Sequence, residues 1–267
     1  MAKPIQLHIP GRNTPPPTDQ PPPAGLDVLF AAPHRPMFLA GAIQTVLTFV
    51  PWVWELLARS GALAGPAWPW PPGWVHGLWA IYGVFPFFVF GFLMTAMPRW
   101  QGMADTPGGA ARRPWLCLVA GWLLFDAGLV VALPGLLAAG LALVLAGWAL
   151  AARFLFPVAF KPGKAGLHPV AAWCALGAGA AGLVAWIAFA LGGNPLAARI
   201  GVSIGMWWLL TPLFMVVGHR MIPFFSASAC PSTRPSGPTG RCGCCSKSGR
   251  AICRGWLRLN QAFGALR

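Results

Sequence analysis

The chain has 267 residues, of which 57% are hydrophobic and only 9% are charged. Soluble domains carry charge on about a quarter of their residues, so this composition excludes an ordinary soluble fold and indicates a membrane protein. The net charge of +14 would also suit a nucleic-acid-binding protein, but most cations flank apolar stretches. We therefore predict the lipid bilayer as the partner and no nucleic acid.

The N-terminal region contains the stretch TPPPTDQPPP and few side chains that could be buried. Proline lacks the backbone N–H that helices and sheets need. A polar, proline-rich segment also gains too little from burial to fold. The sequence therefore predicts a disordered tail over residues 1–32.

The next region, 33–226, holds apolar stretches long enough to cross a bilayer as helices, which takes roughly 17 to 25 residues. The sequence predicts six spans, at about 37–58, 75–97, 114–133, 135–156, 169–191 and 198–218. The expected fold class is an all-α, polytopic transmembrane helix bundle. Short connections predict antiparallel hairpins between the third and fourth spans and between the fifth and sixth.

The positions of Lys and Arg predict the orientation of the bundle, because cytoplasmic loops collect these residues. With a cytoplasmic N-terminus, only Arg59 and Arg199 fall on the outer side, so we predict that both termini are cytoplasmic. The tryptophans of the outer stretch GPAWPWPPGWVHG are expected to anchor at the lipid interface. In the fifth span, CALGAGAAG has small residues at a spacing that lets helices pack closely.

Two His-Arg pairs lie at the predicted cytoplasmic edge. His34 and Arg35 precede the first span, and His219 and Arg220 are expected to form the last turn of the sixth, because Pro223 disfavours helix before it. One interpretation is structural, since cations stabilise a helix C-terminus and mark the membrane boundary. The other is functional: imidazole ligates haem iron or copper, and guanidinium pairs with carboxylates such as haem propionates.

Other side chains could contribute to such a site. Arg99 ends the second span on the same side, whereas His76 begins that span on the outer side. Thioethers could suit Cu(I) or an axial haem position, although most methionines in apolar helices only pack. The methionines concerned are Met94, Met97 and Met221.

Asp126 lies near the middle of the third span, where an ionisable side chain is costly and indicates a function. It could handle protons or pair with a cation, or it could be protonated and hydrogen bonded inside the bundle. The alternative function is therefore a cofactor-free transporter or channel that uses Asp126. His168, beside a basic loop, is interpreted as an interfacial residue. The sequence has no nucleophile elbow or phosphate-binding loop.

Three separated stretches resemble the NnrS family, and they follow the family's order: HRPMFLAGA from residue 34, GFLMTAMPRWQG at 91–102 and GHRMIPFFSASA at 218–229. The resemblance implies a bacterial inner-membrane protein that carries b-type haem and copper and takes part in the response to nitric oxide and nitrosative stress. It does not say whether nitric oxide is turned over or only bound, and we favour a role without catalysis over haem-dependent redox or nitric oxide chemistry. The implied metal ligands are His34 and His219, then His76, with Arg35, Arg99 and Arg220 beside the cofactor.

The chain also departs from the family. A His-x-His-Glu-Met pattern is common where the second helix begins; here His76 takes the first position, while Leu78 and Trp79 replace the second His and the Glu. The family is also longer, so half of the expected membrane domain would be missing. Residues 227–267 are rich in Cys and Arg, and we expect a disordered tail there. The abrupt change suggests translation in another reading frame after residue 229.

Overall fold

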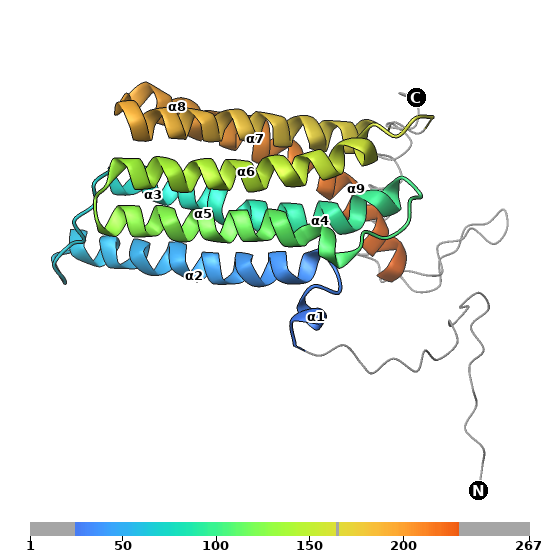
Figure 1. Ribbon diagram of the computed structural model, residues 1–267, viewed down its shortest axis with the longest axis horizontal. Coiled ribbons are helices and arrows are strands. Elements are labelled where there is room, and N and C mark those ends of the chain that lie inside the picture. The colour runs from blue at the N-terminus through green and yellow to red at the C-terminus, as the bar shows by residue number, and fades with distance from the viewer. Residues whose placement is uncertain (1–24, 164–165, 230–267) are drawn as a thin grey trace, which may run out of the picture.

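The computed structural model describes residues 25–163 and 166–229, and these residues form helices without any β-strand. Long helices lie side by side along one axis (Figure 1). The all-α prediction is confirmed, while most of the predicted tails 1–32 and 227–267, namely 1–24 and 230–267, lies outside the described residues. In chain order the elements are α1 (Leu26–Leu29), α2 (His34–Arg59), α3 (Pro72–Leu78), η1 (Trp79–Val84), α4 (Phe85–Trp100), η2 (Gly108–Ala111), α5 (Arg112–Val130), α6 (Pro134–Ala159), α7 (Leu167–Gly192), α8 (Pro195–Ile204), η3 (Gly205–Leu210) and α9 (Thr211–Ala229).

Six continuous helices in the described chain are long and apolar enough to cross a membrane, as predicted. They are His34–Arg59, Pro72–Trp100, Gly108–Val130, Pro134–Ala159, Leu167–Gly192 and Pro195–Ile222. The third ends earlier than expected because 131–133 form a tight turn, in which Ala132 has a φ of 52°. Large apolar side chains such as Leu39, Val46 and Val50 are exposed along α2, as a lipid-facing surface requires.

The antiparallel order gathers alternate helix ends. The starts of α2, α5 and α7 and the ends of α4, α6 and α9 lie at one end of the bundle (Figure 1). We call it the cation-rich end, because the described Lys and Arg gather there, with only Arg59 and Arg199 at the other end. Which side of the membrane this end faces stays a prediction.

Glycines set the closest helix contact, which lies between α5 and α6. A Cβ on Gly121 would lie 2.7 Å from the Val144 backbone N, and a Cβ on Gly140 would lie 2.6 Å from the Phe125 backbone N. Only glycine therefore fits where these two backbones meet. The small residues predicted in the fifth span also pack, since Gly179 faces the Trp148 ring.

Two π-helical segments, η1 and η3, lie in mid-span and are adjacent. The buried Tyr82 of η1 donates a hydrogen bond from its hydroxyl to the Gly201 carbonyl at 2.7 Å. Its ring fits because Gly182 and Gly205 have no side chain there. The Tyr82 hydroxyl thus finds a partner inside the bundle, where water is scarce.

The tryptophan-rich stretch differs from its prediction. Trp70 is only 9% exposed and contacts the rings of Phe125, Trp186 and Phe189. The Trp70 indole is thus packed in the core instead of anchoring at the lipid interface.

The predicted ends of the membrane domain also need correction. α9 does not stop at His219 and Arg220 but continues through Pro223 to Ala229. Proline removes a single backbone donor, which membrane helices tolerate, and Pro51, Pro98 and Pro157 also lie inside helices here. At the other terminus, 26–29 form a helical turn within the region expected to be disordered.

We predict that Gly140→Ala destabilises the bundle by about 1–3 kcal/mol, because the added methyl group would press on backbone that cannot move aside. Gly177→Ala is the matched control, since a Cβ there meets nothing within 4 Å. Thermal unfolding in detergent should show a lower Tm for Gly140→Ala alone. Equal melting of the two variants would contradict the proposed contact.

Candidate functional site

Two histidines meet at the cation-rich end. His168, in the first turn of α7, lies against His219 of α9: His168 Nε2 is 3.0 Å from His219 Nδ1, and the rings stack with centroids 4.8 Å apart. They meet because α7 and α9 pack together. The hydrogen bond orients the His219 ring. The sequence interpretation missed this role of His168, although both residues were predicted at the same edge of neighbouring spans.

Arg220 connects this pair to α4. Its guanidinium carbon lies 5.0 Å from the centroid of the Trp100 ring, the last residue of α4. A cation over an indole face is held by the ring's electrostatic field. The C-terminal part of α9 is thus held against the end of α4.

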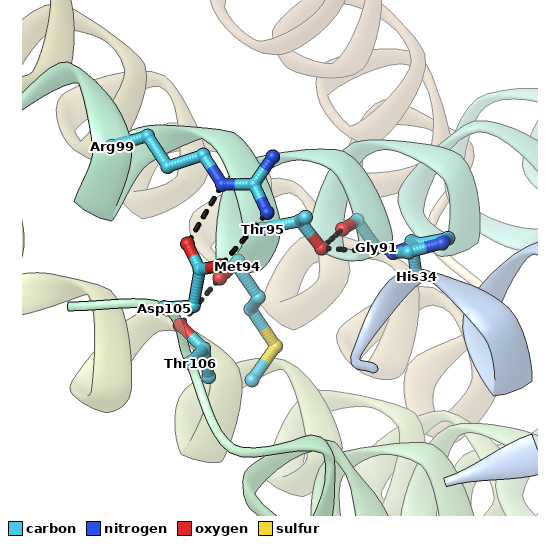
Figure 2. Close-up of polar contacts among 7 residues, drawn as sticks. All are labelled: His34, Gly91, Met94, Thr95, Arg99, Asp105 and Thr106. Carbon is cyan, nitrogen blue, oxygen red and sulfur yellow. Dashed lines mark hydrogen bonds and ion pairs between the residues drawn. The ribbon is translucent and has the colours of Figure 1, made fainter. Parts of the chain in front are cut away.

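His34 lies against the opposite flank of α4, where its Nδ1 is 3.3 Å from Thr95 Oγ1 (Figure 2). The Thr95 hydroxyl donates its only proton to the Gly91 carbonyl at 2.9 Å. A hydroxyl that donates to Gly91 accepts only from a protonated Nδ1, and in a neutral ring with that tautomer Nε2 keeps the lone pair that a metal needs. Gly91 permits this approach, since a Cβ there would lie 2.9 Å from Met37 Cβ of α2.

Arg99, near the end of α4, binds the loop that follows this helix. Its guanidinium donates two hydrogen bonds to Asp105, with Nε–Oδ1 at 2.7 Å and Nη2–Oδ2 at 2.9 Å (Figure 2). The Arg99 hydrogen bond holds the pKa of Asp105 below its usual value. Thr106 then ties the loop to the Met94 carbonyl at 2.6 Å. A haem carboxylate at Arg99 would have to compete with Asp105.

Arg35 and His76, the other two residues predicted at the cofactor site, lie at opposite ends of the bundle. Arg35 donates a hydrogen bond to the Val28 carbonyl at 2.8 Å and is exposed. His76 lies at the opposite end of the bundle, stacked on Trp52 with centroids 4.3 Å apart. Trp52 follows His34 by roughly 27 Å along α2, so His76 cannot share one metal ion with His34.

The donor set at the cation-rich end suits some cofactors better than others. Among the described residues, no three His, Cys, Asp or Glu side chains gather as a metal-ion site. Single imidazoles near guanidiniums instead match the requirements of a haem, which needs axial ligands and partners for its propionates. Of the candidate thioethers, Met94 and Met97 are fully buried in the core.

A second polar group lies inside the bundle. Asp126 of α5 accepts a hydrogen bond from the Trp79 indole at 2.9 Å, so the residue that replaces the family's Glu has a defined partner. Close by, the N–H groups of the buried Gln44 and Trp122 border the backbone of Gly83 and have no hydrogen-bond partner among the described residues. No described cation pairs with Asp126.

Comparison with known proteins identifies one family. The family model described as NnrS protein matches residues 28–243, which is most of the chain. No curated protein and no solved structure matches. The matched region covers every helix that carries a site residue, and with its six apolar spans the chain belongs to the NnrS family.

Proposed function

We propose that this protein binds b-type haem at the cation-rich end and serves in the response to nitric oxide and the protection against nitrosative stress, in the bacterial inner membrane. The observation that supports this best is the hydrogen-bonded pair of His168 and His219. Histidines that ligate metals almost always bond to a second group through their other ring nitrogen. Family membership supports the same function.

In this proposal His219 is the haem ligand, while His34, on the opposite flank of α4, is the candidate ligand of a separate metal group. His168 positions the His219 ring, while Thr95 fixes the His34 tautomer with the lone pair on Nε2. Arg220 and Arg35 are the nearest partners for propionates, because a carboxylate could displace a ring contact or a single carbonyl contact more easily than the bidentate Asp105 on Arg99. A bound haem iron supplies the coordination position for nitric oxide.

Copper belongs to the proposal as a second metal. His76 is its candidate ligand at the opposite end, where the Trp52 ring covers one face of the imidazole. Because Leu78 and Trp79 stand where the family commonly has His and Glu, the site would be weaker than in family members with the full pattern. We propose binding of nitric oxide rather than its turnover as the activity.

We predict that His219→Ala removes most of the haem absorption band from protein purified from haem-supplied cells. His168→Ala should weaken haem binding about 10-fold or more, as loss of a supporting hydrogen bond does at other metal sites. His76→Ala is the control and should keep the band, since His76 lies at the far end. A colourless wild-type protein, or a full band in His219→Ala, would refute the haem site; metal analysis of the same samples measures copper.

The alternative function is a cofactor-free transporter or channel that uses Asp126. The contact with Trp79 favours a structural role instead, because a carboxyl group that accepts an indole hydrogen bond is satisfied inside the bundle. Asn can replace Asp126 in the structural role, because its amide oxygen also accepts a hydrogen bond. It cannot replace Asp126 in proton transport, because the amide does not carry a transferable proton.

We predict that Asp126→Asn melts like the wild type, whereas Asp126→Leu leaves the buried Trp79 N–H unpaired and costs about 1–3 kcal/mol. Thermal unfolding in detergent compares the two variants. In liposomes, ion or solute flux that is present in the wild type and absent in Asp126→Asn would support the transporter instead.

A further inference from the structure

A groove on the surface between α5 and α6 is separate from the histidine site. Its volume is about 540 Å³, and it lies where α5 begins and α6 ends, at the cation-rich end. Its lining combines Arg113 and Arg153 with apolar residues such as Leu150, Phe154 and Phe156. None of the described residues that line this groove carries a carboxylate.

The two arginines have no partner within the described chain. Neither forms a hydrogen bond, an ion pair or a ring contact with a described residue, and both are exposed. Other arginines at this end do have partners: Arg112 lies over the Phe30 ring at 4.9 Å, and Arg99 binds Asp105. Arg113 and Arg153 are therefore a pair of cations on one groove, and no described residue compensates their charge.

The position of Arg153 makes its uncompensated charge costly. It lies inside a membrane-spanning helix, roughly 9 Å before its last residue Ala159, and it faces outward beside Phe156. A cation at this depth needs either water or an anion. Arg113 lies in the first turn of α5, where the helix dipole also disfavours positive charge. An anion between the two side chains would offset both effects.

We propose that this groove binds an acidic phospholipid, whose phosphate is held by Arg113 and Arg153 and whose acyl chain contacts the apolar wall. The positive charge of the groove favours an anion, and basic pockets between membrane helices bind such headgroups. The apolar wall, which continues the lipid-facing surface, favours a lipid over a free phosphate ion. The leaflet is the one at the cation-rich end, whichever side that is.

The test uses the full-length chain, purified in a mild detergent and stripped of lipid. Thermal unfolding is followed as phosphatidylglycerol, phosphatidylcholine or inorganic phosphate is added to the wild type and to variants. We expect phosphatidylglycerol alone to raise the Tm. Each arginine near an anionic headgroup contributes a factor of about five, so R113Q/R153Q should bind phosphatidylglycerol about 25-fold more weakly, and each single variant about 5-fold.

Two controls separate charge from folding. R112Q removes a cation next to the groove that already has a ring partner, and it should respond to phosphatidylglycerol like the wild type. R113K/R153K keeps both charges and should stay within about 5-fold of the wild type.

Four outcomes would overturn the proposal. They are an unchanged response of R113Q/R153Q to phosphatidylglycerol, an equal response of the wild type to phosphatidylcholine, a Tm shift with inorganic phosphate as large as with the lipid, and a wild-type dimer that R113Q/R153Q alone abolishes without any lipid dependence. The last would mean that a second copy of the chain covers the groove.

Discussion

The fold depends on the close approach of helices at glycine, because hydrocarbon offers helices no hydrophobic reason to associate. Gly121 and Gly140 bring α5 and α6 into backbone contact, and the glycines around Tyr82 let α7 and α8 close over its ring. Once these pairs are antiparallel and joined by tight turns, the ends of the helices are fixed. The histidines of α2, α7 and α9 gather at one end as a consequence.

The same packing explains why polar residues of other segments contact the last turns of α4. Its last two turns separate α2 from α9, so His34 reaches Thr95 on one flank while Arg220 reaches Trp100 on the other. Gly91 provides the space for the first contact. A helix with many contacts tolerates few substitutions. The stretch 91–102, which includes the end of α4, is one of the three stretches that resemble the NnrS family.

Much of this arrangement could be predicted from the sequence. Length and hydropathy identify the spans, because a helix in hydrocarbon has to be long and apolar, and charge identifies the end where His34, Arg99 and His219 lie. The contact between His168 and His219 could not be predicted, since it depends on how α7 and α9 rotate against each other. Helix rotation likewise decides that Trp70 turns inward. The extension of α9 beyond Pro223 was missed because rules for proline from soluble helices are too strict in a membrane.

The connection between α2 and α3, residues 60–71, is the longest described one at the end opposite the histidine pair. Trp68 donates to Glu55, which also holds Arg59, and Trp54 donates to the Ala64 carbonyl, so this loop is fastened to the helix before it. The other connections there, 131–133 and 193–194, are too short to project. Within the described chain, an antibody or a protease that approaches this face would therefore meet mainly this loop, whose hydrogen bonds to α2 hold it in place.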